Sequence, residues 1–307
     1  MINSNLQIIR TEERFAQMIS WIWIVVIVVM LVGIIMLAIG VIDGNRYVVR
    51  EESFELPKLT ESCRFVMISD LHGKVYGRDN EKVIADIRKA KPDFIVIVGD
   101  LITSKPKAGI EAGVRLVNEL SKDYRVYYAL GNHETKLKEK REQFGERYEE
   151  LMEAIKHPNV TVLEDAFCEL RELNVRITGL ELERTYFARL KKKELPQDYL
   201  RKHVGVAKED MCNILLAHNP DYFEEYAEWG ADLVLSGHVH GGIMRLPVLG
   251  GVISPSLVLF PRYDGGVFGM KETTMLLGRG MGAHTIPLRF FNPAELYVVS
   301  LEKKADV

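Results

Sequence analysis

The sequence predicts an α/β domain that follows an N-terminal transmembrane helix. Three observations support this prediction. Residues 15–42 carry no charged side chain, short apolar strands alternate with amphipathic helices from Arg64 onward, and polar residues directly follow many of the strands. The 307 residues can hold one large α/β domain or two small ones, and 47% hydrophobic with 27% charged residues is ordinary for a globular protein.

Charge and cysteine usage exclude some classes of protein. The net charge of −3 gives no general attraction to nucleic acid, so no nucleic-acid partner is expected. Cys63, Cys168 and Cys212 are odd in number and lack a CxxC spacing. They therefore predict neither a disulfide framework nor a zinc knot. Nothing in the composition indicates an oligomeric state.

The N-terminal region divides into a tail, residues 1–17, and a predicted transmembrane anchor, residues 18–42. As a helix, the apolar stretch Trp21–Ile42 would be about 33 Å long, enough to cross a hydrocarbon core of about 30 Å. A cleaved signal peptide is the alternative, but its apolar core is normally only about 7–15 residues. A retained, single-pass anchor in the cell membrane is therefore favoured.

Orientation in the membrane does not follow from the flanking charges. Basic residues stand on both sides of the span in similar number, so the positive-inside rule does not decide which side holds the domain. The residues concerned are Arg10 and Arg14 before the span and Arg46, Arg50 and Lys58 after it.

The remaining chain is predicted as a polar linker, residues 43–61, and a folded domain, residues 62–303. Five predicted strands each end in a polar loop: Arg64–Ser69, Phe94–Val98, Arg125–Leu130, Ile214–Ala217 and Leu233–Leu235. The helical periodicity falls on Asn80–Ala90, Ile110–Leu120, Lys136–Lys156 and Tyr222–Trp229. Further short β segments are expected at Val160–Leu163, Phe167–Leu170, Val175–Gly179, Met244–Leu246, Val267–Met270, Thr274–Leu277 and Leu296–Leu301.

Metal-binding residue types gather in the loops that follow the five strands. These residues are Asp70, His72, Asp100, Asn132, His133, His218, His238 and His240. Five of the eight histidines in the chain stand there. Ligands of open α/β sheets bind outside the carboxyl ends of the strands, so these side chains are expected to converge on one edge.

The chemistry of this set points to a catalytic metal site. Carboxylate, amide oxygen and imidazole without thiolate suit Mn²⁺, Fe or Zn²⁺ at a catalytic rather than a structural site. Seven ligands are too many for one open ion but fit two ions that share a bridging carboxylate. Such a pair, about 3.5–4 Å apart, activates a bridging hydroxide for in-line displacement at phosphorus.

The motifs carrying these residues resemble, in chain order, those of the calcineurin-like metallophosphoesterases. They are Asp70-x-His72, Gly99-Asp100, Gly131-Asn132-His133-Glu134, His218 and Gly237-His238-x-His240. The resemblance covers roughly residues 64–301. It implies a four-layer α/β/β/α sandwich and a metal-dependent phosphoesterase.

The resemblance also implies a role for each residue. One divalent ion would be held by Asp70, His72 and His240 with Asp100 bridging, and the other by Asp100, Asn132, His218 and His238. His133 would be the catalytic histidine that is not a ligand, stabilising developing charge or protonating the leaving oxygen. Mn²⁺ is the expected ion, with Fe, Zn²⁺ and Mg²⁺ as alternatives.

Thr103 departs from the family pattern. Many members carry an acidic residue three positions after the bridging aspartate, where this chain has Thr103. If that acid orients the catalytic histidine, the surroundings of His133 differ in this chain and could change the rate or the metal preference. A catalytically impaired metal-binding scaffold is the alternative that this departure supports, although every ligand and His133 are present.

The chain further resembles a membrane-associated phosphodiesterase branch that includes enzymes similar to UDP-2,3-diacylglucosamine pyrophosphatases. The segments that carry this likeness are the N-terminal apolar stretch, residues 241–247, residues 278–282 and residues 293–295. The branch implies cleavage of a phosphodiester or pyrophosphate, with lipids or nucleotide-sugar lipids as candidate substrates. It also implies an extracytoplasmic domain, while a cytoplasmic one remains open.

Three alternatives concern the substrate side of the site. A phosphomonoesterase or protein phosphatase would use the same metals, and the loop sequences do not distinguish them. Arg245 and Arg279 are candidate substrate-binding residues, although Arg245 could equally form a surface ion pair and residues 278–282 a tight turn. The apolar run Val248–Phe260 is predicted as core and turn, with a lipid-facing lip as the alternative.

Overall fold

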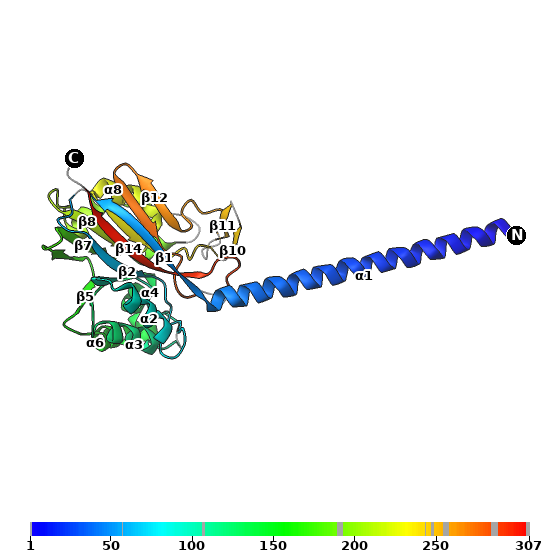
Figure 1. The fold of residues 1–307 in the computed structure, drawn as a ribbon, viewed down its shortest axis with the longest axis horizontal. Helices are drawn as coiled ribbons and strands as arrows, with labels where there is room; N and C mark the ends of the chain where they lie inside the picture. The colour runs from blue at the N-terminus through cyan, green and yellow to red at the C-terminus, as the bar shows by residue number, and fades with distance from the viewer. Residues whose placement is uncertain are drawn as a thin grey trace.

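The computed structural model describes residues 2–56, 58–105, 108–188, 193–242, 244–246, 249–253, 258–283 and 288–304. Pro57 of the predicted linker, Ile243 and Pro247 of the branch-like segment, and Val248 and residues 254–257 of the predicted apolar run lie outside these ranges. Within them the domain consists of two six-stranded sheets, a separate β-hairpin and the helices that flank the sheets (Figure 1).

The first sheet has the strand order β1-β14-β2-β3-β4-β5. Its strands are β1 (Tyr47–Leu56), β14 (Ala294–Lys303), β2 (Cys63–Ile68), β3 (Phe94–Val98), β4 (Arg125–Ala129) and β5 (Val160–Leu163). Strands β2 to β5 are parallel, β14 runs antiparallel to β2, and β1 is parallel to β14. Every residue of β3 is buried, as expected for a strand covered on both faces.

The second sheet has the order β12-β13-β9-β8-β7-β6. Its strands are β12 (Gly266–Met270), β13 (Thr273–Leu277), β9 (Leu233–Ser236), β8 (Cys212–Ala217), β7 (Val175–Leu180) and β6 (Ala166–Leu170). The four central strands are parallel and the two outer ones antiparallel to their neighbours. Strands β10 (Met244–Leu246) and β11 (Gly250–Ile253) pair only with each other as an antiparallel hairpin.

Helices cover the outer faces of both sheets. They are α2 (Glu81–Ala90), α3 (Glu111–Leu120), α4 (Asn132–Glu139), α5 (Arg141–Phe144), α6 (Arg147–Ala154), α7 (Tyr199–Val204) and α8 (Phe223–Trp229), with 3₁₀ turns η1 (Arg184–Phe187) and η2 (Pro220–Tyr222). One apolar core lies between the sheets, and the other two lie between each sheet and its helices. The predicted four-layer α/β/β/α architecture is confirmed.

Helix α1 (Ile2–Asn45) leaves the domain as a single long rod (Figure 1). Residues Gln17–Asn45 are long and apolar enough to cross a membrane, with a mean hydropathy of 3.3 in the most apolar window. Only 6% of that window is buried against the rest of the protein. By length and composition this helix matches the predicted anchor.

Two predicted segments differ in the structure. Within the predicted linker, Tyr47–Leu56 forms β1, which pairs with β14 along ten residues. Its exposed charged residues are typical of an edge strand, and the pairing depends on a partner about 250 residues away that local composition does not reveal. The predicted helix Lys136–Lys156 is instead divided into α4, α5 and α6, with Gly145 in a left-handed conformation (φ 63°) after α5.

Candidate metal centre

The candidate ligands lie where the carboxyl ends of the parallel strands of the two sheets meet. Asp70 and Asp100 follow β2 and β3 of the first sheet, whereas His218 follows β8 of the second. The sheets are joined at this point, because His218 Nδ1 lies 2.7 Å from the backbone oxygen of Val98 at the end of β3. Strands from both sheets therefore position one group of side chains.

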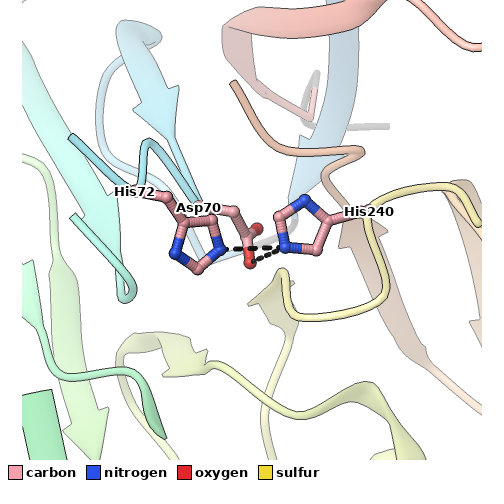
Figure 2. Close-up of side chains that lie close together, drawn as sticks. All are labelled: Asp70, His72 and His240. Atoms are coloured by element: carbon pink, nitrogen blue, oxygen red, sulfur yellow. Dashed lines mark hydrogen bonds and ion pairs between the residues drawn. The ribbon is translucent and has the colours of Figure 1, made fainter. Parts of the chain in front are cut away.

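Asp70, His72 and His240 form the first compact group. One ligand atom from each lies within 4.8 Å of the others. His240 Nε2 is 3.4 Å from Asp70 Oδ1 and 3.0 Å from His72 Nε2. Figure 2 shows the two imidazole rings and the carboxylate turned toward a common point. Three such atoms, two from the loop after β2 and one from the loop after β9, are arranged as a metal ion would require.

Asp100, His218 and His238 form the second compact group, and Asp100 also groups with His72 and His133. Asp100 Oδ2 lies 3.2 Å from His218 Nε2, 3.7 Å from His72 Nε2 and 3.9 Å from His133 Nε2. One carboxylate oxygen thus faces side chains of both groups. That is the position a bridging ligand between two ions would take.

A backbone amide donates to one oxygen of each carboxylate. The His133 N–H donates to Asp100 Oδ1 (2.8 Å), and the His238 N–H donates to Asp70 Oδ1 (2.9 Å). Asp70 Oδ2 and Asp100 Oδ2 are buried and accept no hydrogen bond from the described residues. Asn132 Oδ1 and His218 Nε2 are buried in the same way. Because such groups are costly to bury unsatisfied, this donor set fits divalent cations.

Five of the candidate ligands have a left-handed backbone conformation. These residues are Asp70 (φ 49°), His72 (φ 49°), Asp100 (φ 51°), His238 (φ 72°) and His240 (φ 55°). Positive φ is uncommon for residues other than glycine and costs free energy. Its repetition at one cluster indicates that the fold keeps these side chains turned inward against local preference.

The charges of the cluster shift its pKa values. Burial raises the pKa of Asp70 to about 6, with His218 opposing and Asp100 adding to the rise. Burial alone would lower the pKa of His218, but Asp100 and Asp70 outweigh it and raise that pKa to about 10. Burial likewise opposes ionisation of Asp100, but His218 and His133 hold its pKa well below the usual range. The cluster thus binds protons at places where a cation would compete with them.

Comparison with known proteins identifies the family of the chain. A family model of the calcineurin-like phosphoesterases matches residues 63–242, more than half of the chain. The chain belongs to this family. It is accordingly a metal-dependent phosphoesterase by family; this family uses divalent metal ions, and the clustered Asp and His side chains could bind them.

Individual relatives of this phosphoesterase include a Campylobacter jejuni metallophosphoesterase, 29% identical over 83% of this chain and 63% of that protein. A Danio rerio transmembrane protein with a metallophosphoesterase domain is 25% identical over 81% of this chain and 55% of its own. The UDP-2,3-diacylglucosamine pyrophosphatase of Chlamydia muridarum is 25% identical over 77% of this chain and 82% of that protein. The chain thus spans less than two thirds of the length of the Campylobacter and Danio relatives.

Ser104 contacts the Nδ1 atom of His133 in the phosphoesterase domain. The Ser104 N–H donates to His133 Nδ1 (2.7 Å), and the Ser104 hydroxyl lies 2.8 Å from the same nitrogen. A backbone N–H can only donate, so His133 Nδ1 is an acceptor and the ring proton lies on Nε2. Thr103 itself occupies the position of the family's acidic residue, and its neighbour Ser104 orients His133. The sequence did not reveal this role of Ser104.

Glu134 holds the loop that carries Asp100 through hydrogen bonds to its backbone, a role that the sequence did not reveal. Its buried carboxylate accepts hydrogen bonds from the N–H groups of Asp100 (2.9 Å), Ile102 (3.2 Å) and Gly131 (2.9 Å). Glu134 stands three residues after Gly131, where a helix-capping glutamate is expected. That spacing is a signal that could have identified it. The three bonds fix the loop that carries Asp100.

Arg289 and Asn292 are also absent from the sequence prediction. Arg289 is buried, with Nη2 3.3 Å from His240 Nδ1, and the Asn292 amide donates to the backbone oxygens of His240 (2.8 Å) and Gly242 (2.7 Å). They orient the His240 ring and its loop from outside the cluster. No local motif marks either residue, because each is about 50 residues away from His240.

The two arginines predicted to bind substrate lie in ion pairs. Arg245 Nη1 is 3.0 Å from Asp264 Oδ2, and Arg279 Nη1 is 3.1 Å from Glu295 Oε1. The ion-pair alternative for Arg245 matches this arrangement. Contact of either guanidinium with a substrate phosphate stays a prediction.

Metal affinity is expected to rise with pH. An ion must displace the protons of Asp70 and His218, whose pKa values are raised, so Mn²⁺ should bind at least about tenfold more weakly at pH 5.5 than at pH 7.5. Titration calorimetry of the full chain in detergent measures this difference. An affinity independent of pH would contradict proton displacement at these residues.

Gly131→Ala is expected to disturb the position of Asp100. A Cβ at Gly131 would overlap both the carboxylate and the backbone nitrogen of Asp100. We expect a loss of about 1–3 kcal/mol in the free energy of unfolding together with weaker Mn²⁺ binding. Gly269→Ala is the matched control, because a Cβ at Gly269 has no neighbour within 4 Å. Equal stability and metal affinity in the two variants would contradict the close packing.

Proposed function

We propose that this protein is a membrane-anchored, dinuclear-metal phosphohydrolase that cleaves a phosphodiester or pyrophosphate bond of a lipid or nucleotide-sugar lipid. The observation that carries the proposal is the position of Asp100 Oδ2, which faces His218 on one side and His72 on the other. A single carboxylate between two groups of ligand atoms is what a two-ion phosphoesterase site needs.

The proposed ligands divide between two ions. Asp70, His72 and His240 would hold one, Asn132, His218 and His238 the other, and Asp100 would join both. When bound, two divalent ions lower the pKa of a water molecule and neutralise charge on phosphate oxygens. Mn²⁺ fits the oxygen-rich and nitrogen-rich donor set, which contains no thiolate. Fe, Zn²⁺ and Mg²⁺ are the alternative ions.

His133 is the proposed proton donor to the leaving oxygen. Ser104 accounts for this role, because its N–H donates to Nδ1 and so keeps the ring proton on Nε2. His133 Nε2 lies 3.9 Å from Asp100 Oδ2, which places the donor beside the two proposed metal ions. A positioned donor of this kind contributes roughly 10²–10⁴-fold to the rate.

Two features support a substrate in or near the membrane. The helix Gln17–Asn45 is long and apolar enough to anchor the domain to a bilayer. The Chlamydia relative is named for a lipid-linked nucleotide substrate, and its alignment extends over 77% of this chain. We propose a single-pass protein with an extracytoplasmic domain, following the branch that the sequence resembles.

An activity measurement on the full chain tests the proposal. The protein in detergent is stripped of metal with a chelator and assayed on bis-nitrophenyl phosphate and on nitrophenyl phosphate, with Mn²⁺ returned. We expect diester turnover to disappear with the metal and to return with Mn²⁺. Turnover of only the monoester would favour a phosphomonoesterase, and no turnover with either compound would favour an inactive metal-binding scaffold.

A further inference from the structure

Six exposed apolar side chains gather around the β10–β11 hairpin, and we call them the apolar rim. They are Leu246 (36% exposed), Leu249 (63%), Val258 (45%), Leu259 (62%), Phe260 (59%) and Phe291 (44%). Leu259 forms a β-bridge with Ile253 of β11, and the Phe260 N–H donates to the Val252 oxygen (2.9 Å). Exposed apolar side chains gathered on neighbouring segments in this way are typical of a contact with a membrane or another protein.

Arg289 and Phe290 connect the apolar rim to the end of α1. The Arg289 N–H donates to the Gly40 oxygen (3.1 Å), and the Phe290 ring packs on Gly40, where a Cβ would lie 2.7 Å from it. On its other side Phe290 forms a β-bridge with Met244 of β10, and its oxygen accepts a hydrogen bond from the Arg245 N–H (3.0 Å). One continuous set of backbone contacts thus leads from α1 to the rim.

These contacts fix the depth of the apolar rim relative to the bilayer. Gly40 is three residues before Asp43, so it lies about 4.5 Å along the helix axis from the first charged residue after the apolar stretch. Phe290 therefore packs at the level where a spanning helix would pass from hydrocarbon to headgroups. Figure 1 shows β10 and β11 on the side of the domain from which α1 departs.

We infer that the apolar rim inserts into the bilayer surface from which α1 emerges, as a second, interfacial membrane contact. The inference rests on the proposed anchoring by α1. A lipid surface is the partner because the rim is continuous with a helix that only lipid would cover. Lys74 stands beside the same end of α1, with Nζ 2.7 Å from Asn45 Oδ1, and Arg46, which pairs with Asp43 (2.7 Å), lies next to it. Cationic side chains at this level face lipid phosphates.

The inserted rim would bring lipid phosphates to the metal centre. Strand β10 begins four residues after His240, so the two Cα atoms are at most about 14 Å apart. Asn292, next to Phe291 of the rim, donates to the backbone oxygen of His240. The substrate class that fits is a phosphoester whose acyl chains stay in the leaflet while its phosphate reaches the centre.

Depth-dependent fluorescence quenching of the full chain in vesicles tests the inference. Single cysteines in a Cys168→Ser background, with the buried Cys63 and Cys212 retained, carry a bimane label in three variants: Phe260→Cys in the rim, Val29→Cys in α1 and Val206→Cys as the exposed control. We expect brominated acyl chains to quench the labels at positions 260 and 29, and aqueous iodide to quench only the label at position 206.

The three labels separate failure of the inference from failure of the proposed anchor. If the label at position 29 is quenched by brominated lipid while the label at position 260 responds only to iodide, the anchor stands and the rim does not insert. If position 29 also responds only to iodide, the anchor is wrong and the inference falls with it.

Activity gives an independent readout. Phe260→Asp should lower the ratio of turnover on a vesicle-embedded phosphodiester to turnover on bis-nitrophenyl phosphate by roughly tenfold. Val206→Asp, with the same new charge on an equally exposed residue, should leave this ratio unchanged. Equal ratios in the two variants would overturn the inference.

Discussion

Replacing Asp100 by asparagine is expected to lower diester turnover by about 10³-fold or more and to remove metal from both proposed positions. The carboxylate charge is needed at the one oxygen that faces His72 and His218 (3.7 and 3.2 Å). Asparagine keeps the size of the side chain and an acceptor for the His133 N–H but removes the negative charge. The measurements are steady-state turnover with saturating Mn²⁺ and elemental analysis of the dialysed protein.

Asp123→Asn is the matched control for this substitution. Asp123 is a surface residue that pairs with Arg88 (2.8 Å) near the amino end of β4, so the same chemical change there should alter neither turnover nor metal content. Thermal unfolding establishes that both variants are folded. Normal turnover in Asp100→Asn would contradict the bridging role.

His133→Gln should separate chemistry from metal binding. Without the Nε2 proton that Ser104 keeps in place, turnover is expected to fall by roughly 10²–10⁴-fold, while the metal content stays that of the unchanged protein. The loss should appear in kcat rather than in KM, because His133 is proposed to act on the leaving oxygen. Pre-steady-state and steady-state rates with the nitrophenyl diester measure it.

A substrate series sharpens this test. Leaving groups of lower pKa need less protonation, so the loss in His133→Gln should shrink as the leaving group becomes more acidic. His157→Gln is the control, since His157 lies in the turn before β5 at the opposite end of the sheet. Loss of metal in His133→Gln would instead make His133 a ligand, as its grouping with His72 and Asp100 would allow.

The convergence of the candidate residues was predictable from the sequence. Apolar runs such as Phe94–Val98 and Ile214–Ala217 are long enough to identify strands, and the polar residue after each run then defines its end. Parallel strands place these ends at one edge, which is why Asp100 and His218 could be expected together. The left-handed conformations of the ligands were not predictable, because they depend on the packed loops.

Strand β1 and the role of Arg289, which the sequence did not reveal, depend on distant partners. Strand β1 exists because β14 offers an edge, and Arg289 reaches His240 through a segment that also contacts α1. Ser104 shows the same limit at short range. Its backbone N–H and its hydroxyl both contact His133 Nδ1, and a residue pattern does not reveal that the loop turns these groups toward the ring.

The electron paramagnetic resonance spectrum of the full chain loaded with two equivalents of Mn²⁺ tests the central claim most directly. Two ions about 3.5–4 Å apart that share Asp100 should give the multiline signal of an exchange-coupled pair, and Asp100→Asn should abolish it. The six-line spectrum of isolated Mn²⁺ in the unchanged protein, at the same loading, would contradict a two-ion centre.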